Sequence, residues 1–200
     1  MAQKIVIVNT GCANISSVKF AVERLGVKVT VSDVPEIIQA ADKVFLPGVG
    51  SANAAMASIE QKQLVSCVQQ LRQPVLGICL GMQLLVERSE ESRNDYTPCL
   101  GIIPGEVKRL QVGELRLPHM GWNTVTPLGD SPLFKGIGAG SYFYFVHSFG
   151  VAVSNYTLAS CHYGMDFSAA LHKDNFFGVQ FHPERSSDAG AQLLKNFIEL

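Results

Sequence analysis

The sequence predicts an α/β fold with a mostly parallel central sheet flanked by helices and with a strand-rich second half. In the first half, short fully apolar runs alternate with segments whose apolar residues repeat at helical spacing. After Leu100 the pattern changes to short strands separated by Gly, Pro, Asn and Asp. Because no linker, repeat or low-complexity stretch interrupts the 200 residues, we expect one domain over residues 1–200.

The first half is predicted to consist of strands joined by helices in right-handed crossovers. The expected strands are Lys4–Asn9, Val27–Ser32, Lys43–Leu46 and Pro74–Ile78. Two helices between them are indicated by apolar faces, which comprise Ile15, Val18, Val22 and Leu25 in one and Leu64, Val65, Val68 and Leu71 in the other. Gly26 gives the first helix a natural end. Ligands of such sheets bind outside the carboxyl ends of the strands, so the segments that follow strands should share one edge.

The second half is predicted to be mainly strands, ending in one helix. The candidate strands are Ile102–Leu110, Leu115–Leu117, Trp122–Thr126, Tyr142–Val146, Thr157–His162 and Ser168–His172. Lys173-Asp174-Asn175 is typical of a tight hairpin connection into a further strand, Phe176–Phe181. Leu193, Leu194, Phe197 and Ile198 lie on one side of the closing helix, Asp188–Leu200.

Composition excludes several classes of protein. A net charge of −1 with 16% charged residues gives no electrostatic case for binding nucleic acid or a membrane surface. No apolar run approaches the ~20 residues that cross a bilayer, and the start at Met1 has no signal-peptide pattern. The five cysteines are odd in number and include no Cys-x-x-Cys pair, which favours reduced thiols, no metal site and a cytoplasmic location.

Cys79 has the sequence context of a nucleophile. An apolar strand ends at this residue and helical spacing begins directly after it, which is the pattern of a nucleophile elbow. Gly77 and Gly81 would remove side chains where the strand and helix backbones approach each other. A thiol at this bend would lie over a helix N-terminus, where the macrodipole favours the thiolate and free N–H groups can hold an oxyanion. The alternative is a small core cysteine on a buried strand.

His182 and Glu184 form the second candidate motif. His182 is expected at or just past the end of a strand, and Pro183 biases it toward extended geometry. Glu184 could then hydrogen-bond the far ring nitrogen and support the imidazolium, which would give a nucleophile, its base and an orienting group. The alternative is a capping histidine beside a surface glutamate.

Together, Gly-Ile-Cys-Leu-Gly-Met-Gln at 77–83 and His-Pro-Glu at 182–184 resemble the triad, or class I, glutamine amidotransferases. The resemblance implies their flavodoxin-like fold, a triad of Cys79, His182 and Glu184, and hydrolysis of glutamine through a glutamyl thioester without a cofactor. It also assigns the loop Gly48-Val49-Gly50 to the oxyanion hole and the substrate pocket. It also places Leu80, His147, Ser148 and Phe149 near glutamine, and it points to Glu91 as a partner for the α-ammonium group, whereas the local pattern is typical of a solvated helix end. Gln83 lies at i+4 from Cys79, on the same helix face, where it could bond the substrate.

Three more segments resemble one branch of that family, the glutaminase subunits of imidazole glycerol phosphate synthase in histidine biosynthesis. They are residues 9–18, 118–123 and 142–149, although Thr10 and Cys12 depart from the expected pattern. This resemblance implies a heterodimer with a cyclase subunit that receives the ammonia. The expected interface residues are Asn14, Met120, Gly121, Trp122 and Asn123, with Trp122 open to interpretation as a core residue instead.

Other functions stay open at this point. The chain could serve another synthase, such as those that make anthranilate, carbamoyl phosphate or guanylate. It could also be a binding module that keeps the fold without chemistry, or more distantly a cysteine peptidase.

Overall fold

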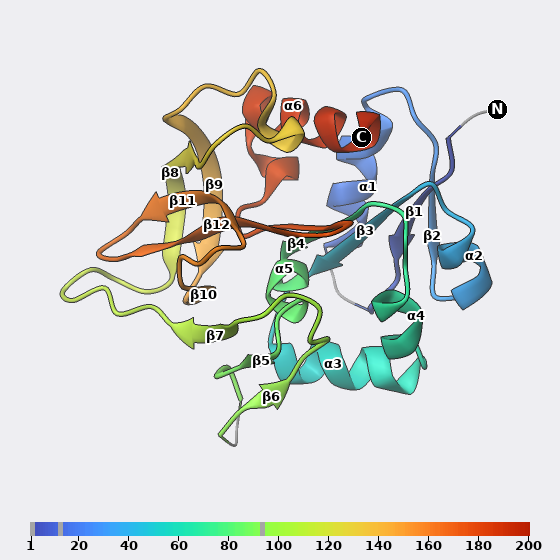
Figure 1. Ribbon diagram of the computed structural model, residues 1–200, viewed down its shortest axis with the longest axis horizontal. Coiled ribbons are helices and arrows are strands. Elements are labelled where there is room, and N and C mark those ends of the chain that lie inside the picture. The colour runs from blue at the N-terminus through green and yellow to red at the C-terminus, as the bar shows by residue number, and fades with distance from the viewer. Residues whose placement is uncertain (1–2, 12–13, 93–94) are drawn as a thin grey trace.

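The structure, a computed structural model, describes residues 3–11, 14–92 and 95–200 (Figure 1). Its helices are α1 (Ile15–Glu23), α2 (Pro35–Gln39), α3 (Ala52–Gln61), α4 (Val65–Gln69), α5 (Leu80–Leu84) and α6 (Ser187–Glu199), with short 3-10 helices at Pro132–Phe134 and Pro183–Arg185. Its strands are β1 (Ile5–Val8), β2 (Val29–Ser32), β3 (Lys43–Gly48), β4 (Val75–Cys79), β5 (Arg88–Ser89), β6 (Thr97–Pro98), β7 (Glu106–Arg109), β8 (His119–Pro127), β9 (Ser141–His147), β10 (Phe149–Val151), β11 (Thr157–His162), β12 (Asp166–Lys173) and β13 (Phe176–Val179).

Among the described residues, nine strands form the central sheet, in the order β2-β1-β3-β4-β13-β12-β11-β8-β9. From β2 to β13 neighbouring strands are parallel, and from β13 to β9 they are antiparallel. Five strands of the second half, β8, β9, β11, β12 and β13, therefore extend the parallel sheet. The turn at Asp174 joins β12 to β13 as the predicted hairpin, with Asp174 at a φ of 55°.

Two apolar layers cover the parallel part of the sheet. Ile5 and Ile7 of β1 pack with residues of α1 and α6, whereas Val6 and Val8 pack with residues of α2, α3 and α4. Figure 1 shows α1 and α6 on one side of the sheet and α3, α4 and α5 on the other. Successive side chains of a strand point to opposite faces, so a strand buried on both sides reads as a continuous apolar run. This explains why the sequence pattern predicted these strands well.

A smaller sheet, β10-β7-β5-β6, lies beside the carboxyl end of β4. Its strands are short, and β5 and β6 have two residues each. The register sets Phe149 of β10 opposite Arg109 of β7. This sheet thus brings the segment that follows β9 close to the segment that follows β5.

Several expected elements differ from the structure. Leu115–Leu117 is not a strand, and of Ile102–Leu110 only Glu106–Arg109 is one, because two or three apolar residues beside glycines and prolines also fit turns. β13 ends at Val179, earlier than expected, and Gly48 belongs to β3 and not to a loop. Glu91 follows a strand and not a helix end. The helices α2 and α3 were not predicted.

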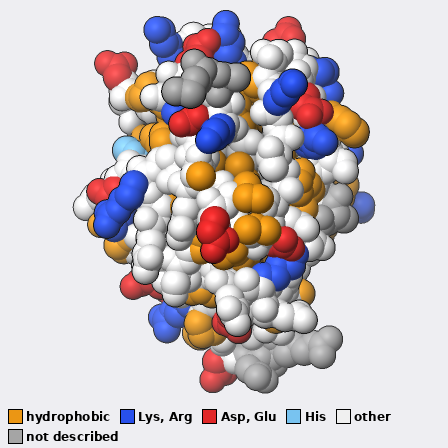
Figure 2. All heavy atoms as spheres, turned by 90° about the vertical axis from the view of Figure 1, so that its right-hand side faces the viewer, with side chains coloured by type: hydrophobic (Ala, Val, Ile, Leu, Met, Phe, Trp, Pro, Cys, Tyr) orange, Lys and Arg blue, Asp and Glu red, His pale blue; other side chains and the backbone are white. Residues whose placement is uncertain are grey.

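The surface mixes charges of both signs. On the face shown in Figure 2, which is the right-hand side of Figure 1, hydrophobic side chains lie between Lys or Arg and Asp or Glu, and neither sign of charge dominates. No helix within the described ranges is long and apolar enough to cross a membrane.

Candidate active site

Cys79 lies at a sharp bend between β4 and α5. Its φ of 54° and ψ of −111° put a non-glycine residue in a strained backbone conformation, of the kind that clusters at functional sites. The flanking glycines are sterically required, as predicted. A Cβ on Gly81 would lie 1.8 Å from the Leu46 carbonyl oxygen, and one on Gly77 would lie 2.7 Å from the Gly81 oxygen. The elbow geometry predicted from the sequence is therefore confirmed.

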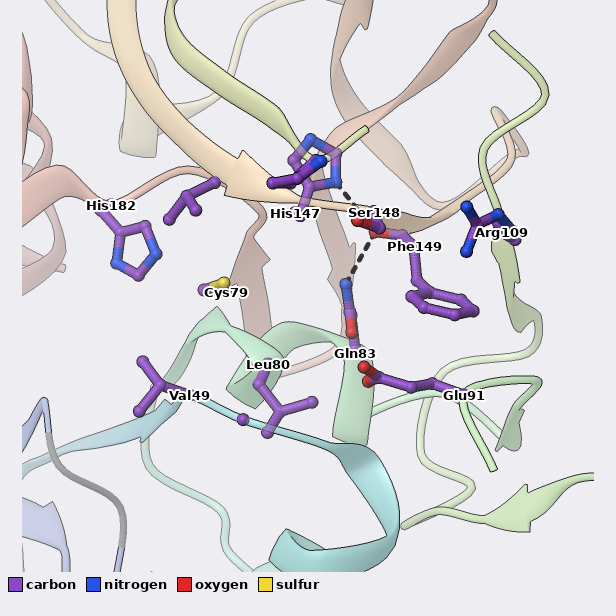
Figure 3. A pocket seen from close by; sticks show the side chains of 13 residues that line it. Val49, Cys79, Leu80, Gln83, Glu91, Arg109, His147, Ser148, Phe149 and His182 are labelled. Atoms are coloured by element: carbon purple, nitrogen blue, oxygen red, sulfur yellow. Dashed lines mark hydrogen bonds between the residues drawn. The ribbon is translucent and has the colours of Figure 1, made fainter. Parts of the chain in front are cut away.

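The helix behind Cys79 is short. α5 has only five residues, so the macrodipole that was expected to favour the thiolate is small. The imidazole ring of His182 lies beside Cys79 in Figure 3.

His182 and Glu184 interact as the sequence predicted. His182 has extended geometry (φ −100°, ψ 94°) before Pro183, and its Nδ1 lies 2.7 Å from Glu184 Oε1. Both side chains are buried, and His182 Nε2 has no hydrogen-bond partner by distance and angle among the described residues. Burial opposes the imidazolium form, but the interactions with Cys79 and Glu184 outweigh it and raise the pKa of His182 to about 10.

Asn14 contacts this group directly. Its Nδ2 donates to Glu184 Oε1 over 2.7 Å, so one carboxylate oxygen accepts from both Asn14 and His182. Asn14 was expected at a partner interface, and the structure shows it holding Glu184. Its neighbour Cys12, part of the same sequence motif, lies outside the described residues.

Two glutamine side chains link Cys79 to the opposite wall of the site. Gln180 Nε2 lies 3.7 Å from Cys79 Sγ, and Gln83 Nε2 donates to Gln180 Oε1 and to the Phe149 carbonyl, each over 2.9 Å. The Gln83 amide nitrogen, which was expected to bond substrate, is thus held by the protein. Only its oxygen is left for a ligand.

A buried pair of histidines supports the same wall. His147 Nδ1 lies 2.8 Å from the Phe149 carbonyl oxygen, and His147 Nε2 lies 2.9 Å from His119 Nδ1. Burial is the largest effect on both rings, and it lowers the pKa of His147 to about 3 and that of His119 to about 4. Because a carbonyl only accepts, a neutral His147 must donate from Nδ1 and accept at Nε2 from His119. The backbone at Phe149 therefore receives bonds from both His147 and Gln83.

These groups surround one pocket of about 370 Å³ (Figure 3). Cys79 and His182 lie at one end of it, and Glu91 and Arg109 lie at the other. The residues that line it are Val49, Gly50, Cys79, Leu80, Gln83, Glu91, Arg109, Pro118, Val146, His147, Ser148, Phe149 and His182. Of the residues that the resemblance placed near glutamine, Gly48 alone does not line the pocket. It packs against α5 instead, where a Cβ would lie 2.8 Å from the Gly81 nitrogen.

Apart from Asn14, the residues expected at a partner interface lie on β8. Met120 and Trp122 are 62% and 52% exposed, which excludes the interpretation of Trp122 as a core residue. Gly121 lies between them, and Asn123 is bonded through Nδ2 to the His162 carbonyl oxygen over 2.9 Å. The Trp122 ring lies 6.1 Å from the Tyr144 ring, over which the Arg185 guanidinium packs at 5.2 Å. The exposed strand is therefore connected by side chains to the segment that carries Glu184.

The other described cysteines are structural. Cys67, Cys99 and Cys161 are free thiols, and burial raises the pKa of Cys99 and Cys161 to about 12. Burial also raises the pKa of Cys67. Within the part of the chain that the structure describes, no group of three His, Cys, Asp or Glu side chains could hold a metal ion.

Sequence reasoning did not assign four residues to the site, Gln180, Arg109, Pro118 and Val146. Gln180 could have been found as the only polar residue in the apolar run before His182. Arg109 could have been found as a basic residue at the end of a candidate strand, but nothing local indicates which way it points. Pro118 and Val146 lie in the segments 118–123 and 142–149 that the resemblance singled out, but neither was assigned to the glutamine pocket, which they line.

Known proteins are similar to this chain over nearly its whole length. Residues 6–200 match the model of the family described as glutamine amidotransferase class-I. The imidazole glycerol phosphate synthase subunit HisH 1 of Vibrio vulnificus is 58% identical over 99% of this chain and 98% of its own, and the HisH subunit of Vibrio cholerae is 57% identical over both full lengths. Two solved structures share the fold. One glutamine amidotransferase has a TM-score of 0.74 at 18% identity, covering 97% of both chains, and one from Thermotoga maritima has 0.68 at 16% identity, covering 100% of this chain and 82% of its own. The elbow, the histidine–glutamate pair and this full-length match lead to one conclusion: the chain belongs to the class-I glutamine amidotransferase family.

Proposed function

We propose that this chain is the glutaminase subunit of an imidazole glycerol phosphate synthase. It hydrolyses glutamine to glutamate and ammonia and passes the ammonia to a cyclase subunit. The observation that carries the proposal is the identity of 57–58% over essentially the whole chain to subunits of that name. The pocket supports the chemistry, since it combines a nucleophile, a base and room for a small polar ligand.

In the first step, the Cys79 thiolate attacks the carboxamide carbon of glutamine and forms a tetrahedral intermediate. Leu80, Val49 and Gly50 line the pocket beside the thiol, and we assign their backbone N–H groups to the oxyanion. His182 gives its Nε2 proton to the leaving nitrogen, and ammonia departs as the thioester forms. Glu184 holds the ring through Nδ1 during this transfer.

In the second step, water attacks the thioester carbonyl. His182, now neutral, takes a proton from the water, and collapse of the second tetrahedral intermediate releases glutamate and restores the thiolate. No atom in this sequence requires a metal or a cofactor. The protonated state of His182 at neutral pH, which its raised pKa indicates, gives the form that is needed when ammonia leaves.

The remaining pocket residues would recognise glutamine. Glu91 is assigned to the α-ammonium group, and His147, Ser148 and Phe149 to backbone contacts along the substrate. The side chains of Gln83 and His147 hold the pocket wall in place, because both bond the Phe149 carbonyl oxygen.

The partner would be the cyclase that joins ammonia to a phosphoribulosyl formimino intermediate. It gives imidazole glycerol phosphate and an aminoimidazole carboxamide ribotide in histidine biosynthesis. We propose a heterodimer in the cytoplasm, with residues 1–200 acting as one domain. The exposed strand face with Met120 and Trp122 is the docking surface that this proposal uses.

Replacement of the nucleophile tests the proposal. Cys79→Ser is expected to abolish glutamine-dependent synthesis and to leave ammonia-dependent synthesis by the reconstituted complex intact, because a neutral hydroxyl is a far weaker nucleophile than a thiolate. The measurement is product formation with glutamine and with ammonium salt, supported by mass spectrometry of protein treated with an electrophilic glutamine analogue. A variant that hydrolyses glutamine at the wild-type rate, or label on another cysteine, would overturn the assignment.

A further inference from the structure

Arg109 is a cation at the end of the pocket that the proposed mechanism does not use. It lines the pocket opposite Cys79 and His182, and Figure 3 shows its guanidinium beside Ser148 and Phe149. Of the described residues that line this pocket, it alone is a lysine or arginine. A site for an amino acid must hold two opposite charges at the α-carbon, and the mechanism above provides for only one.

The backbone of Arg109 is fixed to the pocket wall. Arg109 pairs with Phe149 in the small sheet, and the next residue, Leu110, donates its N–H to the Ser148 carbonyl oxygen over 3.0 Å. On the other side, the Arg109 N–H donates to Glu90 Oε2 over 2.9 Å. The backbone hydrogen bonds therefore fix the position from which the Arg109 side chain extends. The adjacent pocket wall at Phe149 is fixed as well, by hydrogen bonds from Gln83 and His147.

The guanidinium of Arg109 is unengaged within the described chain. No hydrogen bond, ion pair or ring contact joins it to another described side chain, and Arg109 and Glu91 form no ion pair with each other. The neighbouring Lys108 differs, since it is paired with Glu106 over 2.6 Å and does not line the pocket. Both cations line a neighbouring cavity, but of the two only Arg109 also lines the pocket that holds Cys79.

Glu91 provides the complementary charge at the same end of the pocket. Among the described residues, its carboxylate accepts one hydrogen bond, a long one of 3.4 Å from the Ala52 N–H, and burial raises its pKa above the ordinary value. A partly buried carboxylate is stabilised by a cationic ligand group. An arginine fork, in turn, matches a carboxylate with two parallel hydrogen bonds.

We infer that Arg109 binds the α-carboxylate of glutamine while Glu91 binds its α-ammonium group. The pair forms a site for the zwitterionic end of an amino acid, and this site orients the carboxamide toward Cys79. The inference deepens the proposed glutaminase function and rests on it for the identity of the substrate. It makes the pocket selective for free glutamine, because a glutamine side chain within a peptide has neither charge.

Two glutamine fragments separate the two charges. Glutaramate keeps the carboxylate and lacks the ammonium group, whereas 4-aminobutanamide keeps the ammonium group and lacks the carboxylate. Occupancy is measured as protection of Cys79 from iodoacetamide, quantified by mass spectrometry of the Cys79 peptide in the chain assembled with the cyclase. The reagent is neutral, so Arg109 does not steer it, and the assay needs no glutamine turnover.

Arg109→Ala is expected to weaken protection by glutamine and by glutaramate about ten- to a hundredfold, as the loss of a charge-assisted contact predicts, and to leave protection by 4-aminobutanamide unchanged. Glu91→Gln should weaken protection by glutamine and by 4-aminobutanamide and leave protection by glutaramate unchanged. Arg109→Lys should restore part of the affinity, and Lys108→Ala, the matched control on the same strand, should leave all three ligands unaffected. In steady-state kinetics, Arg109→Ala should raise KM by a similar factor with little change in kcat.

Equal weakening of all three ligands by Arg109→Ala, or unchanged protection by glutaramate, would overturn the inference. An unchanged melting temperature for Arg109→Ala shows that the effect is not unfolding. A different result would overturn the proposed glutaminase function without overturning the role of Arg109. If the assembled chain hydrolyses no glutamine while protection of Cys79 still requires Arg109, the glutaminase proposal is wrong and the carboxylate site stands.

Discussion

At the scale of single residues, the site depends on a few buried polar atoms with fixed roles. Glu184 Oε1 accepts from both His182 and Asn14, and its Oε2 has no hydrogen-bond partner among the described atoms. His182 Nδ1 is therefore oriented, and its Nε2 is left for the thiol and the substrate. A buried acceptor without a hydrogen-bond partner lowers the stability of the fold. A role of Glu184 in the reaction therefore explains the arrangement better than a stabilising role does.

The base and the orienting residue should differ in their effect on rate. His182→Ala removes proton transfer, which typically costs ~10²–10⁴-fold. Glu184→Gln can keep an oxygen at the Oε1 position for His182 and Asn14, but it removes the negative charge that supports the imidazolium, so we expect a smaller loss. Glutamine hydrolysis by each variant in the assembled complex measures the difference. Wild-type rates in both variants would leave His182 as a capping residue.

At the scale of elements, the elbow depends on close contact between β3, β4 and α5. Gly48 pairs with Cys79 across the two strands, and α5 packs so closely on β3 that Gly81 touches the Leu46 carbonyl. The strained φ of Cys79 is maintained by this packing. The nucleophile is thus positioned by backbone contacts, which side-chain substitutions elsewhere would hardly change.

Gly81→Ala tests this packing. A Cβ 1.8 Å from the Leu46 oxygen forces the strand and helix apart, and we expect a loss of about 3 kcal/mol or more in the free energy of unfolding, with lower glutaminase activity. The matched control is Gly138→Ala, where a Cβ meets nothing within 4 Å and should change the free energy by less than about 0.5 kcal/mol. Urea unfolding measures both. Equal stability of the two variants would contradict the close approach of α5 to β3.

The sequence predicted the elements whose pattern is set by burial on two sides and missed those defined by tertiary contacts. The strands β1, β3 and β4 are buried along their whole length and were found, and the edge strand β2, of which only the end residues are buried, was found as well. In α3, Ala52, Met56 and Ile59 form a buried face, but alanines and serines around them make the pattern weak. The strand β5 has only two residues, which are too few to show the alternation of buried and exposed side chains that predicts a strand. The triad was predicted from local motifs. The place of Arg109 in the pocket could not be, because it depends on the pairing of β7 with β10.

At the scale of the whole molecule, the pocket joins segments that are far apart in the chain. The parallel half of the sheet supplies Cys79 and His182, and the small sheet supplies Arg109 and one wall. The antiparallel edge formed by β8 and β9 adds an exposed apolar face, defined by Met120, Trp122 and Tyr142. This face is connected to the segment after Glu184 through Tyr144 and Arg185.

Trp122→Ala is expected to weaken binding of the cyclase subunit by about tenfold or more, because large aromatic side chains dominate interface energies. Since Trp122 is 52% exposed, its removal should hardly change the melting temperature. Ile37→Ala, which truncates an exposed apolar residue on α2 beside the opposite edge of the sheet, should change neither quantity. Titration calorimetry with the cyclase and a thermal melt of each variant measure both effects. An unchanged affinity for Trp122→Ala would move the interface away from β8, and a protein that unfolds would show that the residue supports the fold. Reduced affinity with an unchanged melt would place docking at the exposed face beside the triad, where a partner can couple its own ligand to glutamine hydrolysis.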